Sequence, residues 1–367
     1  MRKVIFLSLL LLTASQTIKK PQSGRESYKS FLAEHPFNNR PRLSKAEWKN
    51  NPPQDRPDLA WEQNYLATMD PILGRPAVER LEQVYQIVDQ SNNQLSPSIP
   101  GSAASPWTER GPDNVGGRTR AIMWDPNASS GNKVWAGGVT GGLWYNNNIT
   151  SGTSAWVSVS NQWDNLAITA IAYDPNNSQI FYVGTGEGWG AGASRGAGIW
   201  KSTNGGTTWT QLSSTTNYHY INDLVVRNEN GSSVVYAACR ENYFRGQWHG
   251  VNGLYRSVNG GTSWSQVLPN IPGTSSQYAA ADIEIAADNR IWVGTQETSL
   301  GLSDQGGGRV LYSDNGTTWT VSRTIANGER VELACAPNNS NYVYALTEIG
   351  GQAGEIARST NKGSTWT

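Results

Sequence analysis

Four carboxyl side chains, in loops rich in glycine and aromatic residues, have the chemistry that cleavage of a glycosidic bond requires. Such hydrolysis usually uses two carboxyl groups, about 5–5.5 Å apart in retaining enzymes or about 6.5–9.5 Å apart in inverting enzymes. The four acids are far apart in the sequence, so only a fold that gathers separate loops on one face can pair them. The candidate catalytic residues are Asp164, Glu187, Glu241 and Glu297, and their individual roles stay open.

Aromatic and cationic side chains accompany these acids. Residues 240–249 hold three aromatic rings, two arginines, one glutamate and one histidine. Flat rings stack on sugars or fill pockets on a protein partner, while charged groups fix the orientation of the ligand. Packing of the loops onto one another is an equally good explanation, because aromatic rings also dominate that packing. The predicted ligand-binding residues are Trp163, Trp189, Arg195, His219, Arg240, Tyr243, Arg245, Trp248 and His249.

Other kinds of chemistry have little support in the sequence. His35, His219 and His249 do not have the spacing of metal ligands, so we expect no metal site and no cofactor. No Ser-His-Asp grouping or phosphate-binding loop stands out. The formal net charge is +0, without the clustered basic face that a nucleic-acid partner needs. Cys239 and Cys335 fall in repeats that are not neighbours, and we predict that both are free and buried, a disulfide between them being the alternative.

A repeated turn must position these candidate residues. The stretch Ser202-Thr203-Asn204-Gly205-Gly206-Thr207-Thr208-Trp209 returns at residues 257–264, 313–319 and 359–366. The tryptophans that close the four copies are 55, 55 and 47 residues apart. A period near fifty with strand signals inside each repeat indicates a radial or solenoid repeat protein.

Each copy of the turn has a structural explanation. Asn or Asp side chains accept hydrogen bonds from backbone N–H groups about two residues further on. The glycine supplies a positive φ, and the tryptophan pins the turn by burying its ring. The polar side chains form hydrogen bonds with the backbone of their own turn, so we expect a structural role and not a ligand site. They are Asn204, Gly206 and Trp209; Asn259, Gly261 and Trp264; Asp314, Gly316 and Trp319; and Asn361, Gly363 and Trp366.

Alternating apolar residues between Asn, Asp and Gly breaks predict four strands in each repeat. The fold class is therefore all-β: a β-propeller of four-stranded blades, five repeats being visible and the last one incomplete. The first strands of the blades are expected near residues 118–124, 167–173, 221–227, 280–286 and from 330 onward. In such a blade, the loops between the second and third strands share one face with the loops between blades. The repeated turns lie on the other face, so the candidate acids and rings are expected together.

The amino-terminal part of the chain differs in composition. Residues 1–15 combine two cations, an apolar run and small residues, as in a signal peptide, and predict a secreted or cell-surface protein. No other segment has the composition of a membrane span. Residues 16–106 form a Pro/Asn-rich segment with one predicted helix from Pro76 to Val88 and a linker from Ser91. This segment is expected to be a strap on the propeller, a pro-segment being the alternative.

The propeller is predicted to cover residues 107–367 and to be truncated at the carboxyl terminus. Trp107-Thr108-Glu109-Arg110 resembles the strand that follows each repeated turn. We expect it to complete the last blade of a closed ring, since closure removes free sheet edges.

The repeated turn resembles the Asp-box, or BNR, motif of sialidases, sortilin-type receptors and xyloglucan-cleaving hydrolases, all β-propellers. Residues 111–118 and 134–144 resemble the opening blade of secreted bacterial BNR-repeat proteins, many of them cargo of the type IX secretion route. No sorting tail of that route is present. Xyloglucan-cleaving relatives have a catalytic Asp before the Gly-Gly of the first blade, where this chain has Val139-Thr140. The arginine-containing motif of sialidases is also missing.

Three functions remain open on this basis. The first is a secreted, non-catalytic propeller that binds a polysaccharide or protein ligand on the face opposite the repeated turns. The second is a glycoside hydrolase, of the xyloglucanase or sialidase kind, with its acids on that same face. The third is a structural protein of the cell surface. Turnover of a polysaccharide selects the second, and binding without turnover selects the first.

Overall fold

The computed structural model describes residues 24–36, 38–39, 44, 46, 57–70, 73–74, 76–77, 80, 87, 117–159, 163, 167–189, 194–244, 247–298 and 305–367. The chain forms two compact units, Met1–Asn92 and Asn93–Thr367. The signal peptide and the strand predicted at Trp107 lie outside the described residues, so both stay predictions.

The first unit contains two helices, α1 (Gly24–Glu34) and α3 (Pro57–Thr68). The Tyr28 hydroxyl donates a hydrogen bond to the Leu66 carbonyl and so ties the two helices together. Neither helix was predicted, although Tyr28, Phe31 and Leu32 of α1 recur at helical spacing. The helix predicted from Pro76 to Val88 lies mostly outside the described residues, and Pro76 itself is not helical. No helix in the described part of the chain is long and apolar enough to cross a membrane.

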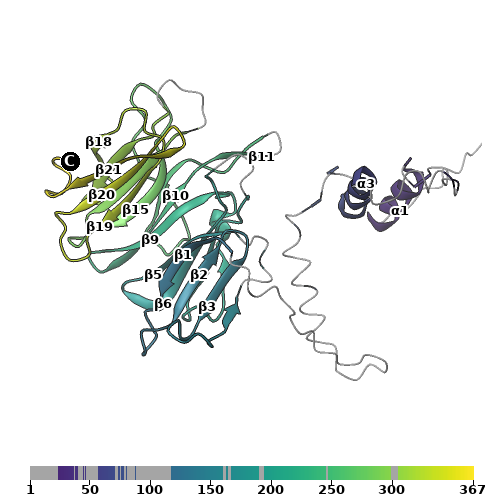
Figure 1. Ribbon diagram of the computed structural model, residues 1–367, viewed down its shortest axis with the longest axis horizontal. Coiled ribbons are helices and arrows are strands. Elements are labelled where there is room, and N and C mark those ends of the chain that lie inside the picture. The colour runs from purple at the N-terminus through teal and green to yellow at the C-terminus, as the bar shows by residue number, and fades with distance from the viewer. Residues whose placement is uncertain are drawn as a thin grey trace, which may run out of the picture. The chain divides into compact units, whose positions relative to one another are not determined.

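The second unit consists of antiparallel sheets that follow one another along the chain, from teal to yellow in Figure 1. Each sheet pairs its strands in chain order, and we number the five as blades. Blade 1 contains β1 (Thr119–Trp124), β2 (Val134–Gly138), β3 (Gly142–Asn146) and β4 (Trp156–Ser158). Blade 2 contains β5 (Ile168–Asp174), β6 (Asn177–Thr185), β7 (Ile199–Ser202) and β8 (Thr210–Gln211), followed by the 3₁₀ turn η3 (Ser213–Thr215).

Blade 3 contains β9 (Ile221–Glu229), β10 (Ser232–Cys239), β13 (Gly253–Ser257) and β14 (Ser265–Gln266). A separate hairpin, β11 (Asn242–Phe244) with β12 (Gln247–His249), interrupts it between β10 and β13. Blade 4 contains β15 (Ala279–Ile285), β16 (Ile291–Gln296), β17 (Arg309–Ser313) and β18 (Thr320–Thr324). Blade 5 contains β19 (Val331–Cys335), β20 (Val343–Ile349) and β21 (Gln352–Ser359), and Thr367 exchanges two backbone hydrogen bonds with Arg358 in the manner of a fourth strand.

The chain is therefore a β-propeller of four-stranded blades, as the sequence predicted. The first strands of consecutive blades lie beside one another, β1 with β5, β5 with β9, β9 with β15 and β15 with β19. In blades 1 to 4 the pairing of the first and second strands shifts by one residue near the start of the first strand. Such bulges redirect side chains. Here they lie in the first strands, which are adjacent from one blade to the next.

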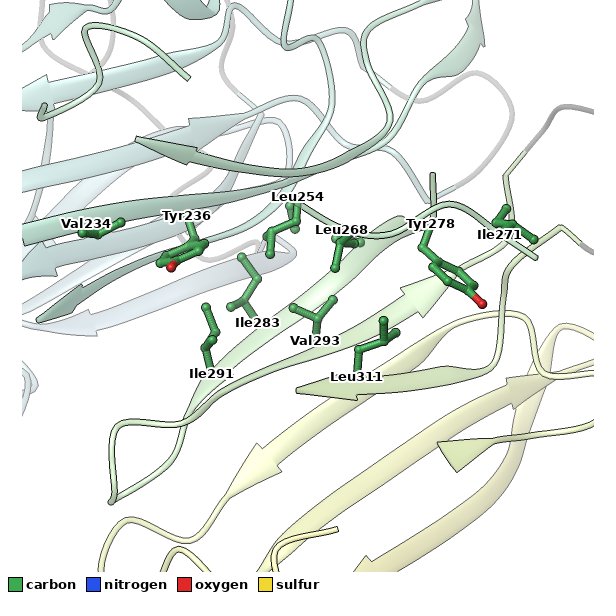
Figure 2. Close-up of a cluster of buried hydrophobic side chains, with 12 residues drawn as sticks. Val234, Tyr236, Leu254, Leu268, Ile271, Tyr278, Ile283, Ile291, Val293 and Leu311 are labelled. Carbon is green, nitrogen blue, oxygen red and sulfur yellow. The ribbon is translucent and has the colours of Figure 1, made fainter. Parts of the chain in front are cut away.

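Apolar side chains fill the space between neighbouring blades. Figure 2 shows one such cluster, in which Val234, Tyr236 and Leu254 of blade 3 face Ile283, Ile291 and Val293 of blade 4. Blades 1 and 2 meet around Trp135, and blades 4 and 5 meet around Trp292. Blades 3 and 4 are packed on both faces, which explains the near-continuous burial of β10 and β16. In β20 of blade 5, buried and exposed residues alternate.

The repeated turns have the predicted structural chemistry. In the first, the Ser202 hydroxyl accepts a hydrogen bond from the Gly206 N–H at 2.9 Å, and Asn204 Oδ1 accepts one from the Thr208 N–H at 2.9 Å. Gly206 has a φ of 83°. A Cβ on Gly206 would lie 2.4 Å from Trp135 of the preceding blade. Glycine is therefore required both by the backbone and by the contact between blades.

The third turn corrects one prediction. The side chain that accepts from the Thr317 and Thr318 N–H groups, at 2.9 and 2.8 Å, belongs to Asn315 and not to Asp314. Asp314 instead forms a two-pronged ion pair with Arg290, at 2.7 and 3.1 Å. The acceptor lies two residues after the Ser in all four turns. The third copy is one residue shorter between the acceptor and the Trp, so Asp314 and not Asn315 lies five residues before the Trp.

Both cysteines are free. Cys239 ends β10 and is buried, and burial raises the pKa of its thiol. Cys335 ends β19 and is only partly buried, so the prediction that both are buried was wrong for Cys335. Burial and the nearby Glu284 carboxylate raise the pKa of Cys335 to about 12, which leaves the thiol protonated and weakly nucleophilic.

Candidate functional site

Hydrogen bonds hold together the loops that carry the candidate residues. The Gly196 N–H donates to the His219 carbonyl at 2.6 Å, which joins the loop after β6 to the segment between blades 2 and 3. Arg240, just after β10, donates from its N–H to the Tyr220 carbonyl and from Nη1 to the Gly188 carbonyl. Blade 2, blade 3 and the segment between them therefore contribute to one continuous surface.

Trp189 lies under two arginines from other blades. The guanidinium carbon of Arg120, in β1, is 4.5 Å from the centre of the indole, and that of Arg330, just before β19, is 4.4 Å from it. Beside this stack, Arg118 Nη2 lies 2.6 Å from Glu187 Oε1. Blades 1, 2 and 5 thus meet here. The ring is already engaged by cations, so a stacking platform for sugar at Trp189 is not supported by its surroundings.

Glu297 follows β16 and is partly buried near other acids. Burial, followed by the charges of Glu329 and Glu348, raises the pKa of its carboxyl, although Arg240 counteracts this shift. Burial lowers the pKa of the Arg240 guanidinium, with Glu297 acting in the opposite direction. General acid catalysis near neutral pH needs a protonated carboxyl group, and a raised pKa favours that protonated form.

His219 is paired with Arg195. Arg195 Nη2 lies 2.9 Å from His219 Nε2, and the ring of His249, from β12, lies 5.8 Å from that of His219. Burial, Arg195 and His249 together lower the pKa of His219 to about 4. Its imidazole is therefore neutral at neutral pH and accepts the hydrogen bond from Arg195.

A second group of charges lies deeper, on the first strands. Asp223 Oδ2 accepts a hydrogen bond from the Ile283 N–H of the next blade at 2.9 Å, and Asp282 Oδ2 accepts one from the Leu333 N–H at 2.6 Å. Burial raises the pKa of Asp223 to about 6, and burial with the charge of Asp223 raises that of Asp282. These carboxylates join the first strands of neighbouring blades.

Two further glutamates belong to this inner group. Burial and the charge of Asp223 raise the pKa of Glu284 to about 7, and burial raises that of Glu332. Burial also lowers the pKa of the Arg120 guanidinium, which the charge of Glu332 partly offsets. Sequence reasoning missed all of these residues. The available signal was the position they share, since Asp223, Asp282 and Glu332 occupy the same place in their first strands.

The remaining predicted site residues have mixed outcomes. Trp163 is 7% exposed, its ring centre lies 4.4 Å from that of Trp200, and it belongs to the core between blades 1 and 2, so its surroundings do not support the predicted ligand role. Asp164 and Arg245 lie outside the described residues. For Tyr243 and Trp248 the structure describes only the backbone, which pairs them across the β11–β12 hairpin. Their roles in binding stay predictions.

Within the described part of the chain, no group of three or more His, Cys, Asp or Glu side chains is arranged to hold a metal ion. The arrangement offers instead carboxyl groups, arginines and hydrogen-bonding loops around one surface. This set of groups can orient a polar ligand and transfer a proton to it.

Comparison with known proteins gives limited similarity. No family profile matches the chain. A xyloglucanase from a Paenibacillus species is 27% identical over 165 residues, which cover 41% of this chain and 15% of that protein. A GH74 enzyme of Niastella koreensis has 24% identity and a TM-score of 0.48, over 68% of this chain and 38% of that one. A GH74 xyloglucanase of Xanthomonas campestris has 16% identity and a TM-score of 0.42, over 69% and 45%. The chain thus spans less than half the length of each.

Proposed function

We propose that this protein acts on a polysaccharide and cleaves it as a glycoside hydrolase, on the surface formed by the loops after the second strands. The observation that carries the proposal is Glu297, a carboxyl of raised pKa that shares this surface with Arg240 and the Arg118–Glu187 pair. The sequence similarity to a xyloglucanase supports a β-glucan of the xyloglucan type as the first substrate to test.

The proposed roles follow from the charges of the two acids. Glu297 is the general acid, because its environment favours the protonated form that can donate to a leaving oxygen. Glu187 is the partner carboxylate, since its ion pair with Arg118 presents a charged, oriented oxygen. The partner acts as nucleophile or as base according to its separation from Glu297 in the complex with substrate. Glu241 stays an alternative partner, on the same surface.

Binding without turnover is the second candidate function. The observation in its favour is the turn of residues Val139–Gly141 in blade 1, which has no acid where xyloglucan-cleaving relatives have one. Under this alternative the same arginines and loops hold the glycan, and the raised pKa of Glu297, caused by burial and the neighbouring acids, has no catalytic role.

The decisive experiment measures release of reducing ends from xyloglucan and, separately, binding of a xyloglucan oligosaccharide. We expect Glu297→Gln to lower kcat by roughly 100-fold or more while leaving binding intact, the scale of general acid catalysis. Glu355→Gln, on β21 and paired with Arg323, is the matched control and should retain full turnover. Unchanged turnover in Glu297→Gln would rule out its role, and binding without any turnover would select the second candidate.

We also infer that the repeated turns are of the Asp-box type and that the protein is exported. The first inference is supported by the Ser and Asn hydrogen bonds that recur in the four turns. Export is supported by the composition of residues 1–15, which matches a cleavable signal peptide. Sequencing the amino terminus of the protein recovered from culture medium tests export, and a start at Met1 would contradict it.

A further inference from the structure

An aromatic side chain occupies the same place in the second strand of every blade. Each of these rings lies opposite the next-to-last residue of the third strand, and the five are Trp135, Tyr182, Tyr236, Trp292 and Tyr344. The first four are 1% exposed or less, whereas Tyr344, in β20 of blade 5, is 40% exposed. Blade 5 therefore has an uncovered ring at a place where the other four blades have a buried one.

The blade that follows along the chain covers each of the four buried rings. A Cβ on Gly363, in the repeated turn of blade 5, would collide with Trp292 of blade 4, so this turn lies directly against the ring. An apolar residue in the first strand of the following blade packs in the same cluster as the ring, as Figure 2 shows for Tyr236 and Ile283. The other three pairs are Trp135 with Ile171, Tyr182 with Leu224, and Trp292 with Leu333. Each junction between these blades thus joins a second-strand ring to a first-strand apolar residue.

Blade 1 has the first-strand residue of such a junction, and that residue is also uncovered. Ile122, in β1, pairs with the residue after Trp135, which is the place that Ile283 and Leu333 have in their own blades. Ile122 is 69% exposed, whereas Ile283 and Leu333 are buried against the preceding blade. Trp156, in β4, is exposed on the same face of the sheet. We call this surface, with Ile122 and Trp156, the blade 1 face.

The uncovered ring of blade 5 belongs to a larger apolar surface. Leu346 lies two residues after Tyr344 in the same strand and pairs with Ile356 of β21, so all three share one face of the sheet. All three are exposed, while Ala345 between the first two is buried against blade 4. We call this surface, with Tyr344, Leu346 and Ile356, the blade 5 face. Exposed apolar groups of this kind mark interaction surfaces. The two faces do not cover each other within one chain, since both are exposed.

We propose that two copies of this chain associate head to tail, with the blade 5 face of one copy packed on the blade 1 face of the other. The four junctions inside the chain identify the occupant, because Tyr344 has the place of Tyr236 and Ile122 has that of Ile283. The contact between copies therefore continues an interface that the fold already repeats, and burial of apolar surface stabilises it. Since the two faces differ, the contact is heterologous and can add further copies in a ring or an open row. It is independent of glycan cleavage, because neither face contains Glu297.

Sedimentation velocity of the full chain at increasing protein concentration tests the proposal. We expect the mass of the parent protein to rise with concentration, and Tyr344→Lys and Ile122→Lys each to remain monomeric, because each has lost one side of the contact. Val258→Lys, at an exposed valine in the repeated turn of blade 3, is the matched control and should associate like the parent. An equimolar mixture of Tyr344→Lys and Ile122→Lys should form a dimer and nothing larger, since each copy supplies the intact face that the other lacks.

A parent protein that stays monomeric at every concentration overturns the proposal, and so does association that survives either Tyr344→Lys or Ile122→Lys. A mixture of these two variants that stays monomeric also overturns it, because association of the parent then does not join the two different faces. Urea unfolding, at a dilution where the parent is monomeric, checks that each variant is folded. If one is not, Ile356→Lys and Trp156→Lys repeat the comparison on the same two faces, and the same outcomes decide.

Discussion

The indole of Trp189, in the loop after β6 of blade 2, lies 4.4 Å from the guanidinium carbon of Arg330, at the start of blade 5. Arg120 of blade 1 lies over the same ring. One side chain therefore connects blades 1, 2 and 5, the last of which is far from the other two in the sequence. This arrangement makes Trp189 part of the structure that supports the candidate site.

Replacing Trp189 should reduce stability. We expect Trp189→Ala to lower the free energy of unfolding by roughly 1–3 kcal/mol, because it removes apolar packing and two cation–π contacts. Urea unfolding followed by far-UV circular dichroism measures the change. Trp124→Ala, at a tryptophan that is 58% exposed, is the control and should change stability by less than about 0.5 kcal/mol. Equal effects of the two changes would contradict the role given to Trp189.

Trp163 gives a second test of structure against binding. Its ring is parallel to that of Trp200 and meets Trp209 edge-on, so Trp163→Ala should cost roughly 3–5 kcal/mol of unfolding free energy. Affinity for a xyloglucan oligosaccharide should be unchanged in whatever fraction remains folded. A stable variant that binds the oligosaccharide more weakly would show that Trp163 takes part in ligand binding.

The third repeated turn allows adjacent residues to be compared. Asn315→Ala removes an oxygen that accepts two backbone N–H groups, and we expect a loss of about 1–2 kcal/mol. Asp314→Ala removes an ion pair whose carboxylate is 69% exposed, and such pairs contribute about 0–1 kcal/mol. The urea concentrations at which the two variants are half unfolded show which of the two residues contributes more to stability. A larger loss in Asp314→Ala would support the assignment made from sequence.

The inner carboxylates predict a dependence of stability on pH. The pKa of Glu284 is raised from 4.5 to about 7, so the folded protein binds this proton more tightly than the unfolded chain. The contribution of this proton to the free energy of unfolding is fully present below about pH 4.5 and is lost as the pH rises through about 7.

Glu284→Gln removes this titration. The variant should therefore be more stable than the parent protein at pH 8 by roughly 1–2 kcal/mol, with a flatter stability profile between pH 5 and 7. Chemical unfolding at a series of pH values measures both effects. Parallel profiles for the two proteins would show that Glu284 has an ordinary pKa.

The sequence by itself determined the blades. The repeated Ser-to-Trp turn and the period-two alternation are local signals, because turn hydrogen bonds and strand pleating depend on neighbouring residues. The first-strand positions expected from the sequence therefore agree with β1, β5, β9, β15 and β19 within a few residues. The assignment of Asp314 as an acceptor in the third turn was wrong, although Asn315 follows Ser313 at the same spacing as the acceptor of every other turn.

The tertiary structure decided which side chains meet. Trp163 and Trp189 are both tryptophans in loops, yet one stacks in the core and the other lies under two arginines, and nothing local distinguishes them. Asp223 and Glu284 appear in the sequence as isolated acids in strands, and only the convergence of first strands buries them together. Contacts between distant blades depend on bulges and on the packing between sheets, and a reading of residue types and spacing does not contain that geometry.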